Sequence, residues 1–142
     1  DTLITHLANY PNPERVSFEV TASTALSNPQ QVLGFADKSM HVGIGVFIDN
    51  VGSCPGNIKA LMNIPVRGIK LAGGLIRHYE EQEAVREYVA HVLSLCDQHS
   101  VCVVAEHIED ENQLERVMRL NIRYAQGYVF SPPTESIRFT AH

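Results

Sequence analysis

"GIGVFIDN", residues 43–50, contains a nearly continuous apolar run over 43–48, a predicted strand, which ends abruptly in a carboxylate and a carboxamide. Such a run is typical of a strand buried on both faces, as in a parallel sheet covered by helices. Asp49 and Asn50 fit two roles. They form a turn, which both residue types favour, or they belong to a site at a strand's carboxyl end, where parallel α/β folds place their chemistry.

Further apolar runs and helical patterns alternate on both sides of this strand. The other predicted strands are Val16–Val20, 66–72, 101–105 and Tyr124–Ala125. Asn28 is the predicted N-cap of a helix whose first residue is Pro29, and the Gln31 side chain is expected to reach back to the N-cap backbone. The apolar stripe of that helix is Val32, Leu33, Ala36 and Met40. A short helix is predicted over Asn57–Met62.

Two more helices complete the pattern. The longer one is Glu80–Gln98, with apolar positions at Ala84, Val85, Tyr88, Val89, Val92, Leu93 and Cys96. The second is capped by Asp110 and carries Leu114, Val117 and Met118 on one face. Strand and helix thus alternate about five times, which predicts an α/β fold with a parallel sheet. Both a doubly wound sheet and part of an eight-stranded barrel fit. The first strand lacks a glycine-rich phosphate loop, which counts against a dinucleotide fold.

The composition is that of one globular domain. The chain has 142 residues, 44% of them hydrophobic and 19% charged, and a net charge of −5. This charge argues against a DNA or RNA polymer as partner. No apolar stretch approaches the roughly 18 residues of a membrane span. Cys54, Cys96 and Cys102 lack metal or disulfide spacing, so we expect reduced cysteines and a cytoplasmic domain. A membrane anchor elsewhere in a full-length protein stays open.

Each predicted strand delivers a polar residue at or near its carboxyl end. In chain order they are Glu19, Asp49 with Asn50, Lys70, Glu106 and Gln126. In a barrel these ends meet at one mouth, where active sites lie. Lys70 lies in an apolar run and needs a carboxylate partner, because an unpaired lysine is expensive to bury. Glu106 or Glu109 is the expected partner.

This set of residues has the chemistry of a metal-dependent hydrolase. Glu19 and Asp49 are hard oxygen ligands of the kind that Mg²⁺ or Mn²⁺ prefers. Lys70 and Glu106 could orient or deprotonate a metal-bound water for attack on phosphorus. His107 lies between two glutamates, but a zinc site needs three or four ligands and no second histidine has suitable spacing.

The ordered motifs resemble the EAL domain family of bacterial cyclic di-GMP phosphodiesterases. The family pattern has an E-[IV]-T-E strand, DDFGTG, a Pro-Val-Lys-Ile-Asp run, AEGVE and QGY followed by proline. In this chain the corresponding stretches read "FEVTA", "IDNVGS", "IPVRGIKLA", "AEHIEDENQL" and "QGYVFSPP". The order and spacing fit the family from about Val16 to Pro133. The resemblance implies a (β/α)8 TIM-like barrel, of which this chain holds about five β/α units.

The resemblance also implies a role for each matched position. Glu19 and Asp49 match metal-binding carboxylates, and the implied metal is Mg²⁺ or Mn²⁺. Lys70 and Glu106 match residues that position or activate the attacking water. Glu109 matches the second glutamate of AEGVE, and Gln126 the glutamine near the water. The residues that contact the nucleotide stay unassigned.

Several positions depart from the family pattern. Asn50 replaces the second aspartate of DDFGTG, and Val51 replaces the phenylalanine. Ala22, Ala72 and His107 replace a glutamate, an aspartate and a glycine. The Glu-Ala-Leu strand and the asparagine-bearing strand lie upstream in the family, whereas only 18 residues precede Glu19 here. We therefore expect residues 1–142 to be the C-terminal part of an EAL-like domain.

These departures set the functional expectation. We expect a degenerate EAL domain in bacterial cyclic di-GMP signalling that is non-catalytic as given, either a nucleotide receptor or a protein-interaction module. Losing several ligands at once should remove metal binding rather than merely weaken it. The alternative is a metal-dependent phosphodiesterase that converts cyclic di-GMP to linear pGpG when the domain is complete. Expected partners are cyclic di-GMP, other domains of the full-length protein, and a second copy or another chain that completes the barrel.

Overall fold

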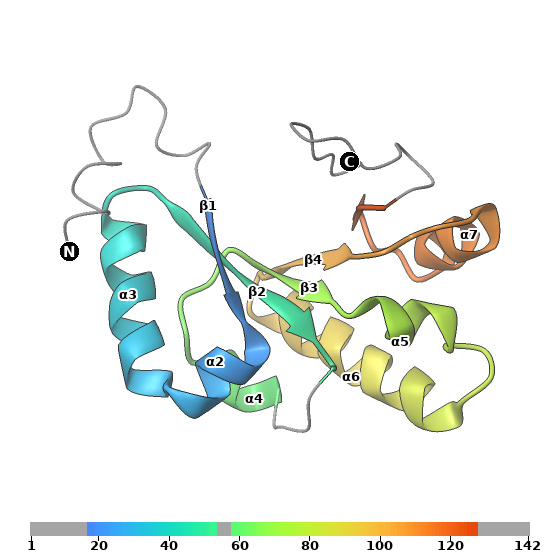
Figure 1. The fold of residues 1–142 in the computed structure, drawn as a ribbon, viewed down its shortest axis with the longest axis horizontal. Helices are drawn as coiled ribbons and strands as arrows, with labels where there is room; N and C mark the ends of the chain where they lie inside the picture. The colour runs from blue at the N-terminus through green and yellow to red at the C-terminus, as the bar shows by residue number, and fades with distance from the viewer. Residues whose placement is uncertain (1–16, 54–57, 128–142) are drawn as a thin grey trace.

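Five parallel strands form one sheet in the computed structural model, which describes residues 17–53 and 58–127 (Figure 1). The strands are β1 (Ser17–Thr21), β2 (Gly45–Val51), β3 (Gly68–Leu71), β4 (Cys102–Ala105) and β5 (Tyr124–Ala125). They lie side by side in sequence order. A doubly wound sheet would reverse this order at a switch point. The α/β fold is therefore wound as an arc of a barrel, and this prediction is confirmed.

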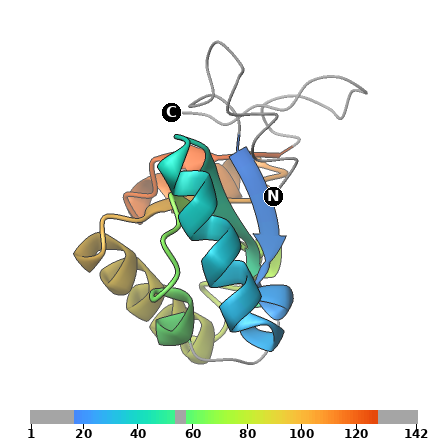
Figure 2. The same ribbon diagram turned by 90° about the vertical axis from the view of Figure 1, so that its left-hand side faces the viewer.

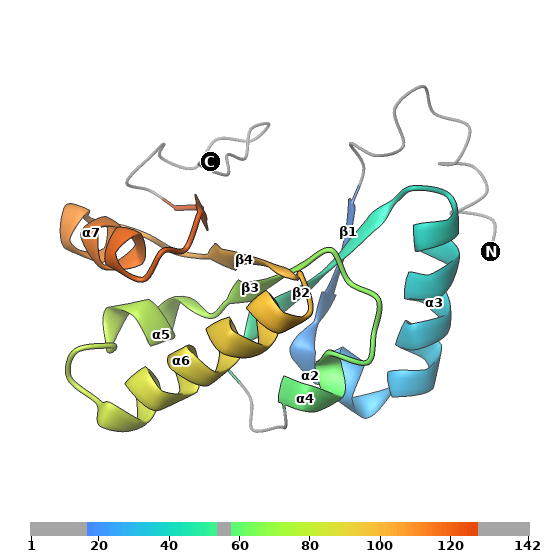
Figure 3. The same ribbon diagram turned by 180° about the vertical axis from the view of Figure 1, so that it is seen from behind.

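The helices connect successive strands. They are α2 (Ala22–Ser27), α3 (Pro29–His41), α4 (Ile58–Leu61), α5 (Gly73–Arg77), α6 (Glu83–Gln98) and α7 (Glu111–Arg119). They flank the sheet in Figure 1, with α3 at its left, α2 and α4 below it, and α5, α6 and α7 towards the right. Figure 2 shows α3 running alongside β1 and β2, and Figure 3 shows α6 in front of the sheet when it is seen from behind. The opposite face of the sheet is the one that carries the polar strand residues.

Strand alternation divides the side chains between these two faces. Ile48, Ile69 and Leu71 belong to the buried core beneath the helices and are fully shielded from solvent. Glu19 is in register with Phe47 and Gly68. These positions alternate with the core positions and so lie on the other face. Burial of the alternate apolar side chains against the helices thus places the polar side chains on the opposite face of the sheet.

The second strand is longer than predicted. We expected it to end at Ile48, before Asp49, but it continues to Val51. Asp49 pairs with Thr21 of β1, and the register against β3 shifts between Ile48 and Val51. Asn50 takes a left-handed conformation with φ 60° at this irregularity. A β-bulge lets the strand continue past two polar residues, which a reading of apolar runs misses.

The helix predictions need several corrections. α2 and α5 were not predicted, and α6 begins at Glu83 rather than Glu80. α2 is capped by Thr21, whose hydroxyl accepts a hydrogen bond from the Thr24 N–H. Asn28 occupies the N-cap of α3 as predicted, but its side chain makes no capping hydrogen bond. Asp110 caps α7 as predicted, accepting from the Gln113 N–H at 2.8 Å.

Some predicted stripe residues face solvent. Val32 and Ala36 are buried, whereas Leu33 and Met40 of α3, Ala84 of α6 and Met118 of α7 are exposed. Ser39, Leu95 and Gln113 are buried instead. In α3 the buried face is set by Phe35, whose ring lies 4.9 Å from that of Phe18. Ser39 tolerates burial there because its hydroxyl donates to the Phe35 carbonyl.

Cys96 is buried and Cys102 is half-buried, and both are free thiols. Burial raises the pKa of the Cys96 thiol to about 11, so this group is an unreactive core residue. Cys54 lies outside the described residues, as do Val16 and Asn57. Among the residues described, no helix has the length and apolar character to cross a membrane.

Candidate cation site at the strand ends

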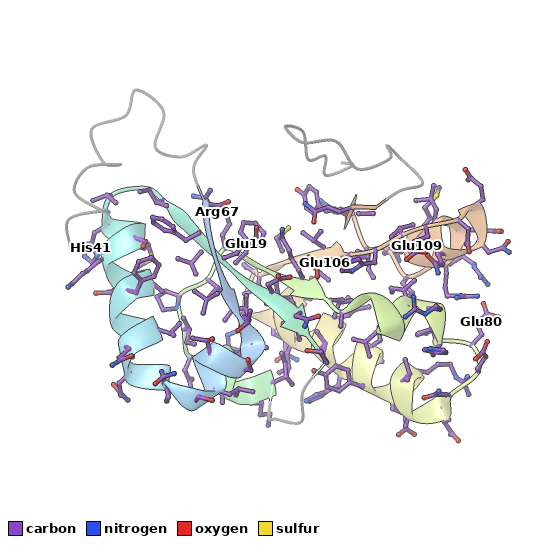
Figure 4. All side chains as sticks on the ribbon, viewed as in Figure 1. Glu19, His41, Arg67, Glu80, Glu106 and Glu109 are labelled. Atoms are coloured by element: carbon purple, nitrogen blue, oxygen red, sulfur yellow. The ribbon has the colours of Figure 1, made fainter. Side chains whose placement is uncertain are left out.

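Three carboxylates from three different strands meet on the polar face of the sheet. Glu19 comes from β1, Asp49 from β2 and Glu106 from the residue after β4. One oxygen of each lies within 4.8 Å of the others. Figure 4 labels two of them, Glu19 on β1 and Glu106 just after β4. The predicted convergence of strand ends therefore holds for these three residues.

Lys70 joins the cluster from β3. Its ammonium group lies 2.8 Å from Glu19 Oε1, and it donates to Gln126 Oε1 at 3.4 Å. The side chain is only 11% exposed, so this pairing satisfies a charge that would be costly to bury alone. We predicted Glu106 or Glu109 as the salt-bridge partner, and that was wrong. Glu19 is in register with Gly68 through Phe47 of the intervening strand. Lys70 lies two residues after Gly68, so its side chain is on the same face of the sheet as that of Glu19.

Backbone hydrogen bonds fix the positions of these side chains. The Asn50 N–H donates to Asp49 Oδ1 at 2.8 Å, which orients that carboxylate. The Gln126 N–H donates to the Ala105 carbonyl at 2.9 Å, and the Ile108 N–H donates to the Gln126 carbonyl at 2.9 Å. Gln126 is thereby tied on both sides to the segment that carries Glu106. The cluster is built on strand ends rather than on a free loop.

Glu106 is the member of the cluster whose pKa is raised. Its burial, the hydrogen bond to Asp49 and the Asp49 charge raise its pKa from the ordinary 4.5 to about 8. The positive charge of Lys70 works in the opposite direction. Without a cation, the folded chain therefore holds a proton on Glu106 at neutral pH. A buried carboxyl beside another carboxylate is a familiar cause of such a shift.

The cluster fits a single divalent cation in both donor type and charge. Carboxylate oxygens are the ligands that Mg²⁺ and Mn²⁺ prefer. With Glu106 ionised, three carboxylates and one ammonium carry two net negative charges. A divalent ion would balance that charge and displace the Glu106 proton. Glu19, Asp49 and Glu106 are therefore the residues that would hold it.

The raised pKa of Glu106 predicts a pH-dependent stability of the metal-free chain. Between pH 4.5 and about 8 the folded chain binds a proton that the unfolded chain has lost. Stability is therefore greatest below 4.5 and falls as the pH rises towards 8, because folding then favours the protonated form. We expect urea unfolding midpoints in EDTA to fall over this interval. Glu106→Gln should flatten the slope and Glu109→Gln should preserve it. Equal slopes for wild type and Glu106→Gln would contradict this assignment.

Two predicted site residues are not among the three carboxylates of the cluster. Asn50 is exposed at the bulge of β2. Glu109 is exposed on the loop that leads to α7, as Figure 4 shows, and its N–H donates to the Gln113 side chain. The roles assigned to Lys70, Glu106, Glu109 and Gln126 in activating a water stay predictions. The sequence reading also missed Gly73, beside His107, and Gly127, which lies against the Ile108 backbone.

The chain matches a known protein family and known proteins. The model of the EAL domain matches residues 1–133. The cyclic di-GMP phosphodiesterase PdeF of Escherichia coli K12 is 32% identical over 116 residues, which are 82% of this chain and 16% of PdeF. The cyclic di-GMP phosphodiesterase RocR of Pseudomonas aeruginosa is 26% identical over 127 residues, or 89% of this chain and 32% of RocR. The chain thus spans a minor part of these relatives.

Solved structures show the same fold. The PaMucR phosphodiesterase in complex with c-di-GMP aligns with a TM-score of 0.79 and 26% identity, over 88% of this chain and 51% of that one. The EAL domain of FimX from Pseudomonas aeruginosa, bound to c-di-GMP, aligns with a TM-score of 0.82 and 18% identity. That alignment covers 95% of this chain and 57% of the FimX chain.

Proposed function

The chain belongs to the EAL domain family, and on that premise we propose that it binds cyclic di-GMP in bacterial signalling without hydrolysing it as it stands. The observation that carries this proposal is the meeting of Glu19, Asp49 and Glu106 within 4.8 Å, beside the Lys70 ammonium. A cation at these carboxylates and the adjacent ammonium together suit a phosphodiester anion. Relatives of this fold carry c-di-GMP in their solved structures.

A bound Mg²⁺ or Mn²⁺ would supply a positive charge that attracts and polarises a phosphate oxygen. The protein's own residues account for the rest of the recognition. Lys70 is held by Glu19 and Gln126 in a fixed position, so its charge is pre-organised. Pre-organised charges lower the entropic cost of binding an anion.

The charge of the cluster favours binding over catalysis. Two divalent ions would bring four positive charges to residues that carry two net negative charges. Two-metal hydrolysis depends on shared carboxylates to offset the repulsion between the ions. Asn50, which directly follows Asp49, has no charge to add, and it is exposed. This set of residues therefore suits one cation better than two.

The second candidate function is phosphodiester hydrolysis by the complete domain. It is supported by the retained Lys70, Glu106 and Gln126 and by the 32% identity to a cyclic di-GMP phosphodiesterase. In that case residues elsewhere in a full-length protein would supply further metal ligands, and the product would be linear pGpG. We place the domain in the cytoplasm under either function, in keeping with its free cysteines.

Partners beyond the nucleotide follow from the shape of the sheet. Within the described residues, β1 and β5 are the edge strands of an arc, and its polar face is not covered by helices. Unpaired strand edges favour pairing with further chain. We propose that further domain sequence, a second copy or another chain completes the barrel. Light scattering of the 142-residue chain should then show association, whereas a monodisperse monomer at high concentration would contradict it.

Calorimetry on the complete domain tests the main proposal. We expect cyclic di-GMP to bind in the presence of Mn²⁺ with no pGpG formed, and binding to weaken in EDTA. Product analysis by chromatography separates the two candidate functions. Turnover by the purified 142-residue chain with Mg²⁺ or Mn²⁺ would overturn the non-catalytic assignment, and absence of binding by the complete domain would overturn both.

Asn50→Asp tests whether one charge limits the site. The change adds a carboxylate directly after Asp49, at the family's second aspartate position. We expect tighter Mn²⁺ binding by roughly tenfold, since an added carboxylate near a divalent ion contributes on the order of 1 kcal/mol or more. Titration calorimetry measures the affinity, and pGpG formation reports any gain of activity. Asn121→Asp, at a left-handed residue after α7, is the matched control and should leave Mn²⁺ affinity unchanged.

A further inference from the structure

Four non-glycine residues of the described chain have a left-handed backbone: Asn50, Ser100, His107 and Asn121. Two of them simply end helices. After Ser100 the Val101 N–H donates to the Cys96 carbonyl, and after Asn121 the Ile122 N–H donates to the Val117 carbonyl. These are the bonds of a Schellman helix end, which needs a left-handed residue. Ser100 and Asn121 therefore have a structural explanation.

Asn50 and His107 do not follow helices. Each directly follows a carboxylate of the cation site, Asp49 and Glu106 respectively. Asparagine and histidine are both enriched at left-handed positions, although the geometry costs either of them more than it costs glycine. At Asn50 it belongs to the bulge of β2 and to the hydrogen bond from the Asn50 N–H to Asp49 Oδ1. Strained residues that persist at a candidate site point to a function. His107, with φ 58°, is therefore the residue that needs an explanation.

The turn itself does not require an imidazole. After His107 the Ile108 N–H reaches the Gln126 carbonyl, and the Ile108 side chain is completely buried. Glycine would form the same turn without steric cost. The His107 side chain contributes nothing to these bonds and is exposed. Among residues 17–53 and 58–127 its imidazole has no hydrogen-bond or salt-bridge partner.

The neighbouring loop provides a place for that side chain. A Cβ added to Gly73 would lie 2.7 Å from His107 Cβ and 3.1 Å from its Cγ and Nδ1. Gly73 begins α5, three residues after Lys70, so the imidazole covers the loop that follows β3. Because Gly73 has no Cβ, the imidazole can occupy this position without a clash. The exposed ring thus lies beside the start of α5, on the residue that directly follows Glu106 of the cation site.

We propose that the imidazole of His107 contacts the bound cyclic dinucleotide on the β3–β4 side of the cation site. This inference rests on the proposed nucleotide-binding function. The exposed ring offers a flat surface and a hydrogen-bonding nitrogen, both suited to a nucleotide. Gly73 is then the residue that positions the ring.

His107→Gly in the complete domain separates binding from stability. We expect cyclic di-GMP affinity by calorimetry in Mn²⁺ to fall about tenfold, the loss of one good ligand contact. The melting temperature should stay the same or rise, because glycine relieves the backbone strain. Asn121→Gly is the matched control, since it relieves the same backbone geometry at the end of α7, and it should leave affinity unchanged. Wild-type affinity in His107→Gly, or a loss of affinity only in proportion to a loss of folding, would overturn the inference.

A double-mutant cycle tests the role of Gly73. Gly73→Ala should displace the ring and weaken binding about as much as His107→Gly. The double variant should bind no more weakly than His107→Gly alone, because the added methyl then has no ring to displace. Additive losses would overturn the positioning role. If the wild-type protein does not bind cyclic di-GMP, the proposed function is refuted. If the wild-type protein binds it and His107→Gly binds it equally well, only this inference is refuted.

Discussion

Glu106→Gln is expected to weaken divalent cation binding by about 100-fold or more. The substitution keeps the size of the side chain and removes one of three carboxylates that lie within 4.8 Å of one another. Outer-shell partners of metal ligands typically contribute 10–100-fold to affinity, and a direct ligand contributes at least as much. The loss should appear in Mn²⁺ titration calorimetry at pH 8, close to the raised pKa of Glu106, where roughly half of the wild-type carboxyl is already ionised before the ion binds.

The pH dependence of cation binding sharpens this experiment. In wild type the ion must displace the proton that Glu106 holds, because the pKa of that carboxyl is raised to about 8. Wild-type affinity for Mn²⁺ should therefore rise between pH 6 and pH 8, with proton release into the buffer. Glu106→Gln should lose most of this dependence. Glu109→Gln removes the same charge from the exposed end of the same loop and should bind Mn²⁺ like wild type. Equal weakening by both variants would show that general charge, rather than coordination, holds the ion.

The sequence predicted which carboxylates lie close together, but it did not predict which side chains pair with one another. Glu19, Asp49 and Glu106 were placed together because polar residues at the ends of consecutive parallel strands share one edge of the sheet. The partner of Lys70 was not predictable in this way. Its choice of Glu19 depends on which side chains share a face and on how far the long lysine side chain reaches, and neither is encoded in local sequence.

Local signals also limited the prediction of element boundaries. The bulge at Asn50 extends β2 because pairing with β1 continues through Asp49, a long-range effect. Leu33 and Met40 fitted a helical stripe by spacing, yet the aromatic contact between Phe35 and Phe18 sets the buried face of α3. α5 was missed because Gly73 and Gly74 oppose helix formation, whereas its buried residues Leu75 and Ile76 favour it through tertiary packing.

Gly127→Ala is expected to cause the largest loss of stability. Gly127 has φ 148°, and a Cβ there would overlap the backbone nitrogen and oxygen of Ile108 and lie 2.8 Å from its carbonyl carbon. Backbone atoms cannot move aside as a flexible side chain can. The segment would have to give up the hydrogen bond from the Ile108 N–H to the Gln126 carbonyl. We expect a loss of about 3 kcal/mol or more, the range of a strained backbone combined with a broken buried contact.

Urea unfolding of the 142-residue chain measures this effect, with Gly34→Ala as the matched control. Gly34 lies within α3 and a Cβ there meets nothing within 4 Å, so alanine should stabilise the chain by about 0.5–1 kcal/mol through helix propensity. The same chemical change thus has opposite signs at the two positions. Because Gln126 contacts Lys70, Gly127→Ala should also weaken Mn²⁺ binding in whatever fraction stays folded, whereas Gly34→Ala should not. A Gly127→Ala variant as stable as wild type would mean that the β5 end does not pack against Ile108, and the placement of Gln126 beside Lys70 would fall with it.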